Sequence, residues 1–110
     1  MTERTYRVEW TEVARRDLEE IVDHVSKDRP VAALRLLDLI EEKASSLSSL
    51  PLRGRLPPEL GRFEVRHYRE LVIPPYRLIY RLLGDSVFIL GVFDGRRNLE
   101  DLLLKRLLSF

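Results

Sequence analysis

Four arginines in the second half of the chain are the residues best suited to binding an anion. Arg77 and Arg81 lie in the run YRLIYRL, and Arg96 and Arg97 follow the next apolar run. The planar guanidinium group matches phosphate and carboxylate, and converging arginines repel one another unless a partner supplies negative charge. We therefore interpret these four arginines as a patch at one end of a sheet that binds an anionic target.

Pairing within the chain is the competing explanation for the arginines. Glu70 and Asp94 lie on neighbouring strand-like runs, and either carboxylate could pair with Arg77 or Arg97. Most arginines on sheets are solvated or locally paired. Both interpretations stay open at the level of the sequence.

Three residues near the arginines are candidates for proton transfer, namely His67, Tyr68 and Tyr80. A tyrosine with a pKa near ~10 is a poor base unless strongly perturbed. Histidine can transfer protons near neutral pH, but a single histidine in a strand is more often structural than catalytic. The chain has no cysteine and only two histidines, so we expect neither a metal site nor a cofactor.

Size and composition indicate a single domain over residues 1–110. The chain is 45% hydrophobic and 34% charged, which suits one core and a soluble protein. No apolar run approaches the ~20 residues that cross a bilayer, and the N-terminal sequence lacks the apolar core of a signal peptide. We therefore expect a cytoplasmic protein without membrane contact.

The small net charge of +1 conceals an asymmetry between the two halves of the chain. Residues 1–52 contain 8 Lys and Arg against 11 Asp and Glu, whereas residues 53–110 contain 11 against 7. A basic half of this kind can serve an anionic partner, either nucleic acid or an acidic protein.

The first half of the chain predicts a strand and a helical hairpin. Residues 6–10, YRVEW, alternate apolar and polar side chains as a half-buried strand does. Thr11 suits a helix N-cap, and Pro30 suits the first turn of a second helix. The first helix should direct its charged residues toward water, among them Asp17. The short connection between the helices predicts an antiparallel pair.

The second half predicts a loop and three strands. The segment SSLPLRGRLPPELGRF contains five Pro and Gly residues, so we expect an irregular surface connection. Strands are expected within FEVRHYRELVI, YRLIYRL and SVFILGVF. A turn at Pro74 and Pro75 separates the first two strands, and Gly84-Asp85 predicts a two-residue hairpin turn between the last two.

The predicted hairpin fixes which residues face one another. With Gly84 and Asp85 in the turn, Arg77 should lie opposite Val92, at the end of the sheet from which Arg96 and Arg97 emerge. Alternation along the strand separates two faces. One face carries Arg77, Ile79 and Arg81, and the other, expected to face the core, carries Tyr76, Leu78 and Tyr80.

The C-terminal segment NLEDLLLKRLLSF predicts a short helix that begins near Asn98. One stripe of this helix contains Leu99, Leu103, Leu107 and Phe110. Three further leucines, Leu102, Leu104 and Leu108, lie outside the stripe. So wide an apolar surface exceeds what one domain face covers, so we predict that these three leucines contact a protein partner. A deeper position of the helix in the domain is the alternative.

The predicted order is strand, helix, helix, three strands and a short helix. An α+β fold with a helical hairpin packed on one face of a largely antiparallel sheet satisfies this order most simply.

This arrangement, together with YRELVIPPYRLIYRLLGDSVFILGVFDGRRN, resembles the RelE/ParE superfamily of toxins from type II toxin–antitoxin systems, also called plasmid stabilisation proteins. The resemblance covers nearly the whole chain. Its most specific parts are residues 76–80, YRLIY, and the segment from Val92 to Arg97 that ends in Gly-Arg-Arg; the opening YRVEWTEVARRDLEEI also matches. The resemblance implies a small toxin that a cognate antitoxin holds inactive.

The superfamily contains two activities. RelE-like members cleave mRNA on the ribosome, using basic residues to hold the phosphate and a further group to move the proton. ParE-like members inhibit DNA gyrase without chemistry of their own. A third possibility is an orphan binding module that keeps the fold and has lost toxicity.

The sequence contains only some of the catalytic residues of RelE-like members. Arg77 and Arg97 match their two arginines. Tyr68 and Glu70 stand where RelE has lysines, Leu103 stands at the catalytic tyrosine, and Asp94 replaces a histidine used by other relatives. These departures favour a gyrase inhibitor over an enzyme. A nuclease would have to rely on Arg77 and Arg97, with Tyr68, Tyr80 or His67 for the proton.

Overall fold

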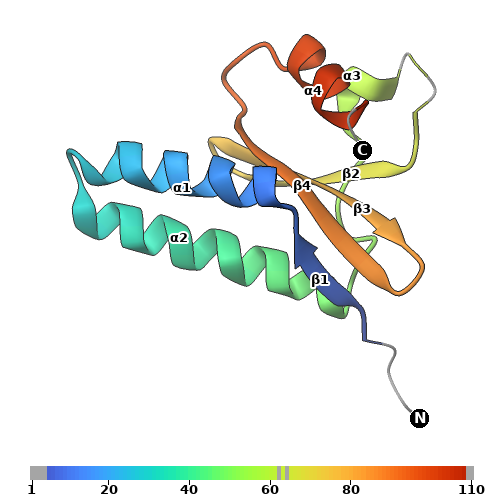
Figure 1. Ribbon diagram of the computed structural model, residues 1–110, viewed down its shortest axis with the longest axis horizontal. Helices are drawn as coiled ribbons and strands as arrows, with labels where there is room; N and C mark the ends of the chain where they lie inside the picture. Colours follow the sequence, from blue (N-terminus) through green and yellow to red (C-terminus); the bar gives the residue numbers. More distant parts are fainter. Residues whose placement is uncertain (1–4, 62, 64, 109–110) are drawn as a thin grey trace.

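The computed structural model describes residues 5–61, 63 and 65–108. Along the chain (Figure 1) the elements are β1 (Arg7–Trp10), α1 (Glu12–Ser26), α2 (Pro30–Ser45), the 3-10 helix η1 (Ser46–Ser48), α3 (Pro58–Gly61), β2 (Tyr68–Ile73), β3 (Tyr76–Leu83), β4 (Ser86–Asp94) and α4 (Glu100–Leu107). No helix in these described ranges has the length and apolar character needed to cross a membrane.

The strands form one sheet in the order β1-β4-β3-β2. β1 runs parallel to β4, and the other neighbours are antiparallel. The α1–α2 hairpin covers one face of the sheet, and α3 and α4 gather on the other side (Figure 1). The predicted α+β architecture is therefore confirmed.

Local sequence signals explain where the helices and the tight turn begin. The hydroxyl of Thr11 accepts a hydrogen bond from the Ala14 amide at 3.2 Å and donates one to the Ile89 carbonyl at 2.9 Å. This residue therefore caps α1 and also fixes it to β4. Pro30 occupies the first turn of α2 as predicted, and Gly84 adopts a φ of 60° in the β3–β4 turn.

Both faces of the sheet are buried. The tyrosine face of β3 packs against α1 and α2 as expected, with Tyr76, Leu78 and Tyr80 in that core. A second, smaller core covers the opposite face, where Ile79 packs with leucines of α4. The leucines of α4 make this second core possible, because burying them removes apolar surface from water.

The segment before β2 is not the surface connection that its prolines and glycines predicted. Gly54, Pro57 and Leu60 are buried, and residues 58–61 form one helical turn. Arg55 bridges to Glu70 at the edge of β2. A side chain at position 54 would lie 2.6 Å from the Glu70 carbonyl oxygen, so glycine permits this close approach. Proline and glycine exclude long regular elements, but they allow a tightly packed irregular segment.

The predicted β3–β4 register is correct only near the turn. Tyr80 lies opposite Ile89 as expected, but an irregularity between Ile79 and Tyr80 shifts the pairing by one residue. Arg77 consequently lies opposite Phe93 rather than Val92. An extra residue on one strand produces such a bulge, and the sequence of the turn does not reveal it.

Candidate functional site

The guanidinium of Arg77 is enclosed by two carboxylates. Glu59 of α3 accepts from Nη1 at 2.5 Å and from Nη2 at 2.6 Å, and Oε1 of Glu70 accepts from Nε at 2.7 Å. Only 10% of the Arg77 side chain is exposed. The pairing with Glu70, which the sequence left open as the competing explanation, is present, whereas Glu59 carried no recognisable signal in the sequence.

These contacts change the ionisation of both partners. Accepting hydrogen bonds from Arg77 lowers the pKa of Glu59, and donating them to Glu59 raises the pKa of Arg77. Both effects favour the charged forms.

Arg55 extends this arrangement to four charged residues. The Glu70 side chain is fully buried, and its Oε2 accepts from Nε of Arg55 at 2.6 Å. We call Arg55, Glu59, Glu70 and Arg77 the Arg77 network. It joins α3 and the preceding segment to β2 and β3. Since all three donor nitrogens of Arg77 already contact carboxylates, its observed role is to hold these elements together.

Arg96 and Arg97 lie on the surface directly after β4. Asp94 accepts from Nε of Arg96 at 3.0 Å and from Nη2 at 2.7 Å. These hydrogen bonds lower the pKa of Asp94 to about 2. In the part of the chain that the structure describes, no carboxylate pairs with the Arg97 guanidinium. Arg97 is therefore better placed than Arg77 to meet an external anion.

Arg77 and the Arg96–Arg97 turn share one end of the sheet, as predicted. A Cβ atom at Gly95 would lie 3.0 Å from Cδ of Arg77, so the stem of Arg77 passes beside this turn. Its guanidinium nevertheless points to Glu59 and Glu70. In the predicted patch, Arg96 and Arg97 are exposed, whereas the Arg77 side chain is buried and paired with two carboxylates.

The three candidates for proton transfer do not form one group. Tyr80 is buried in the core beneath the helical hairpin, while Tyr68 is buried in the core on the opposite face. The Tyr80 hydroxyl accepts a hydrogen bond from the Gly54 amide at 3.0 Å, and burial raises its pKa. His67 is exposed, with its ring 5.9 Å from that of Tyr68.

Asp17 and Arg106 form a second buried contact that the sequence did not suggest. Asp17 was expected to face water, but its Oδ2 accepts from Nη1 of Arg106 at 2.7 Å and from the Val92 amide at 3.1 Å. Arg106 also lies over the Phe93 ring at 4.9 Å. The prediction failed because the partner comes from α4 on the other side of the sheet, whose Arg106 side chain reaches the Leu90 carbonyl of β4 and Asp17.

The C-terminal helix buries most of its leucines within the domain. Leu99, Leu103 and Leu107 are buried as predicted; Phe110 lies outside the described residues. Leu102 and Leu104 are partly buried against the second core, while 84% of Leu108 is exposed. Contact of Leu102, Leu104 and Leu108 with a partner stays a prediction, and Leu108 is the member with the most accessible surface.

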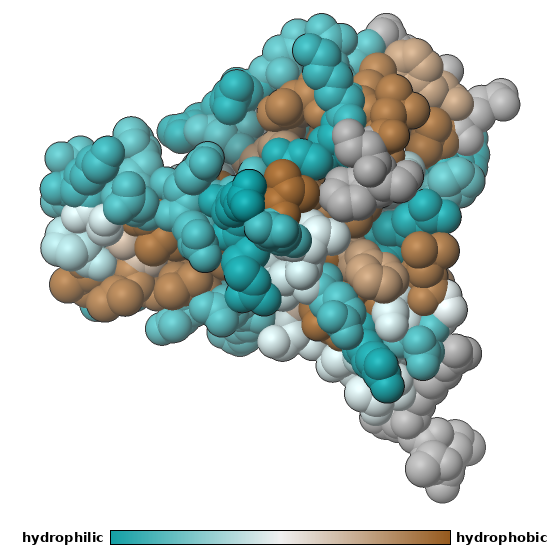
Figure 2. Space-filling view, viewed as in Figure 1, coloured by the Kyte–Doolittle hydropathy of each residue, from teal (hydrophilic) through white to brown (hydrophobic). Residues whose placement is uncertain are grey.

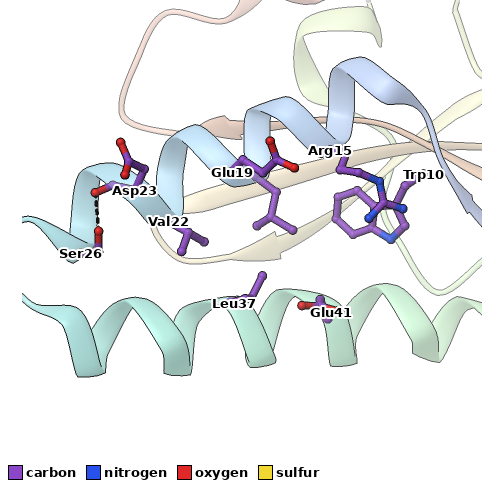
Figure 3. A pocket seen from close by; sticks show the side chains of 9 residues that line it. Trp10, Arg15, Glu19, Val22, Asp23, Ser26, Leu37 and Glu41 are labelled. Atoms are coloured by element: carbon purple, nitrogen blue, oxygen red, sulfur yellow. Dashed lines mark hydrogen bonds between the residues drawn. The ribbon is translucent and has the colours of Figure 1, made fainter.

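A concavity lies between α1 and α2 (Figure 3). It has a volume of about 400 Å³. Its lining includes Trp10, Val22 and Leu37, with charged side chains from both helices at its edges, among them Glu19 and Glu41 (Figure 3). We call this concavity the hairpin groove. The described lining combines four apolar side chains with five polar or charged ones, a mixture that an amphipathic protein segment can match.

A second concavity of about 370 Å³ lies where β4 ends, between α1 and α4. Its lining includes Arg96 and Arg97 as well as Asp17 and Arg106. Within the described residues there is no cluster of His, Cys, Asp and Glu that could hold a metal ion.

Comparison with known proteins identifies relatives over most of the chain. Residues 8–99 match the family described as the ParE toxin of the type II toxin–antitoxin system parDE. Toxin ParE3 of Caulobacter vibrioides is 35% identical over 82% of this chain and 87% of its own length. Toxin RelE2 of the same organism is 34% identical over 83% of this chain and 97% of its own length.

Solved structures show the same fold. A chain of the chromosomal ParDE toxin–antitoxin system from P. aeruginosa superimposes with a TM-score of 0.68 at 26% identity, covering 83% of this chain and 97% of that one. A chain of the RelBE2 toxin–antitoxin complex from Mycobacterium tuberculosis gives 0.57 at 32% identity, covering 84% and 94%. The element order, the sheet and the sequence matches agree: this chain belongs to the ParE toxin family of type II toxin–antitoxin systems.

Proposed function

We propose that this protein is a growth-inhibiting toxin that acts on DNA gyrase in the cytoplasm and is neutralised by a cognate antitoxin. The observation that carries the proposal is the enclosure of Arg77. This residue matches a catalytic arginine of RelE-like nucleases, yet its donors contact Glu59 and Glu70. A donor that stabilises a phosphate transition state has to point at the reacting group.

The positions of the tyrosines support a binding mechanism over catalysis. General acid–base catalysis requires the proton-transfer group within hydrogen-bonding reach of the reacting atoms. Tyr68 and Tyr80 are buried in cores on opposite faces of the sheet. His67, the residue before Tyr68, is exposed to solvent. Such an arrangement favours inhibition through a surface contact, with Arg97 as the proposed contact residue.

Two assays on the purified chain separate the two activities. We expect the wild-type chain to inhibit gyrase supercoiling and to leave ribosome-bound mRNA intact. Arg97→Ala should weaken the inhibition, whereas Arg35→Ala, at an exposed position on α2, is the matched control and should not. Cleavage of the mRNA by the wild-type chain would overturn the gyrase proposal.

The helical hairpin is the proposed antitoxin surface. The hairpin groove supplies an apolar lining, and α2 exposes Val31 and Leu34 by 61% and 62%. Figure 2 shows apolar surface on the part of the molecule where α2 lies. Exposed apolar patches of this kind commonly mark protein interfaces. The two solved relatives come from toxin–antitoxin systems, which supports an antitoxin as the partner.

Expression in bacteria tests toxicity and neutralisation together. The chain alone should stop growth, and co-expression of the antitoxin encoded beside it should restore growth. A chain that is harmless and finds no neutralising partner would instead be a binding module that has lost toxicity.

A further inference from the structure

A small pocket lies on the α4 side of the sheet, toward the β3–β4 turn. It has a volume of about 210 Å³ and is lined by Thr11, Arg81, Leu83, Phe88 and Leu90. We call it the Arg81 pocket. Phe88 and Leu90 also belong to the second core, so the pocket continues that core outward. Ligand pockets for small molecules usually measure about 300–1,000 Å³, so this one suits a single side chain.

Arg81 is the charged residue of this pocket, and its Nε atom is buried without a hydrogen-bond partner. The guanidinium lies over the Tyr68 ring, 5.7 Å from the centroid. The face of an aromatic ring attracts the positive charge of the guanidinium, but it offers the Nε–H group no lone pair to accept a hydrogen bond. A buried donor without an acceptor is unfavourable, and buried donors in folded proteins are nearly always satisfied.

Other arginines of this protein show what Arg81 lacks. Arg55, Arg77, Arg96 and Arg106 each contact a carboxylate within 2.7 Å. The Thr11 hydroxyl, the other polar side chain among the described lining residues, already bonds to Ile89 and Ala14. Nε of Arg81 therefore needs an acceptor that no described residue supplies, and a carboxylate is the acceptor that these other arginines use.

We propose that the Arg81 pocket is a docking subsite for a protein segment that places an apolar side chain beside a carboxylate. The apolar side chain packs against Leu83, Phe88 and Leu90. The guanidinium of Arg81, which lies over the Tyr68 ring in the free chain, turns toward the pocket so that its buried Nε can donate to the carboxylate. The identification of the partner as the antitoxin rests on the proposed function. Charge complementarity selects an acidic segment, because the described residues of the pocket lining include one cation and no anion.

Nuclear magnetic resonance detects this contact directly, because the Nε–H group of arginine gives its own signal in a ¹⁵N-labelled chain. The probe is acetyl-Leu-Glu-Leu-amide, and acetyl-Leu-Gln-Leu-amide is its neutral control. We expect the glutamate peptide to shift the Arg81 signal saturably, together with the amide signals of Leu83 and Phe88. The glutamine peptide should bind at least about tenfold more weakly. Arg81→Lys, which has no Nε–H group, assigns the signal.

A second experiment measures affinity for the antitoxin encoded beside the chain. Arg81→Gln should weaken binding at least about tenfold, and Arg66→Gln, an exposed change in the segment before β2 and outside the helical hairpin, should leave it unchanged. Equal circular dichroism spectra and thermal midpoints for the variants establish that each is folded.

The outcomes separate the two proposals. If neither peptide moves the Arg81 signal and the antitoxin binds Arg81→Gln as tightly as the wild type, the docking subsite is wrong while the toxin proposal stands. If the chain is harmless and no antitoxin binds it, the toxin proposal fails, and the peptide titration alone decides whether the pocket binds an acidic segment.

Discussion

Arg77 and Arg81 lie on one strand and on the same face of the sheet, yet their surroundings differ completely. Arg77 is enclosed by carboxylates from α3 and β2. Arg81 lies four residues further along β3. Its guanidinium lies over the Tyr68 ring, and its buried Nε has no acceptor. The residues around each arginine make the difference. At one end α3 supplies Glu59, whereas at the other the described lining of the Arg81 pocket includes no acidic side chain.

This contrast separates a residue that holds the fold from one that is available to a partner. A buried charge that has lost its partner is strongly unfavourable, while a paired one contributes little net stability. We therefore expect substitutions at Arg77 to act on folding and substitutions at Arg81 to act on binding.

The largest effect is expected for Arg77→Ala. Removing this cation leaves Glu70 fully buried with only Arg55 and leaves Glu59 without its partner. The free energy of unfolding should fall by about 3–5 kcal/mol, as measured by urea denaturation. The double variant Arg77→Leu/Glu70→Leu should recover part of this loss, since it removes the uncompensated buried charge. A loss below about 1 kcal/mol for Arg77→Ala would contradict a structural role.

The next largest effect is expected for Arg106→Ala. Arg106 joins α4 to Asp17 of α1 and to the Leu90 carbonyl of β4, so its loss should cost about 2 kcal/mol, as charged hydrogen bonds do. Hydrogen exchange should become faster in α4 before it does in β3. Arg97→Ala removes an exposed arginine and is the matched control. Unchanged exchange in α4 would show that leucine packing alone holds this helix.

The sequence predicted elements more successfully than it predicted contacts between them. Thr11, Pro30 and Gly84 act within a few residues, and their preferred backbone conformations are local properties. The register of the hairpin was correct up to the bulge beyond Ile89, because turn geometry controls only the adjacent pairs. The wide apolar surface of the last helix was recognised, but the second core that buries most of it was not.

The candidate site shows the same limit. Pairing of Arg77 with Glu70 could be foreseen because adjacent strands bring these residues together. Glu59 and Asp17 could not be foreseen, since their partners are 18 and 89 residues away along the chain. The exposure of Arg97 likewise depends on how the turn after β4 directs its side chain.

A smaller effect concerns the pH dependence contributed by Glu59. Its pKa is lowered in the folded chain from 4.5 by hydrogen bonding to Arg77, so the folded state favours the carboxylate. This stabilisation is present above the unfolded value of 4.5 and is lost as the pH falls through the lower folded pKa. Glu59→Gln should therefore be less stable than the wild type by about 1 kcal/mol at pH 7.

Urea denaturation at pH 7, 5, 4 and 3 tests this prediction. The stability difference between wild type and Glu59→Gln should be constant from pH 7 to pH 5 and should shrink toward pH 3. Asp38→Asn changes an exposed carboxylate on α2 and serves as the control. A difference that does not vary over this range would indicate that Glu59 acts through packing rather than through its charge.

The smallest effect on folding is expected for Arg81→Gln, and it sharpens the contrast most. The substitution removes the buried Nε donor that has no acceptor, which is favourable. It also removes the contact of the guanidinium with the Tyr68 ring, which is unfavourable. The two changes oppose one another, and the free energy of unfolding should stay within about 0.5 kcal/mol of the wild type. Urea denaturation of the free chain measures this value. A loss comparable to that of Arg77→Ala would mean that Arg81 also holds the fold, and the pocket would then have to be attributed to packing.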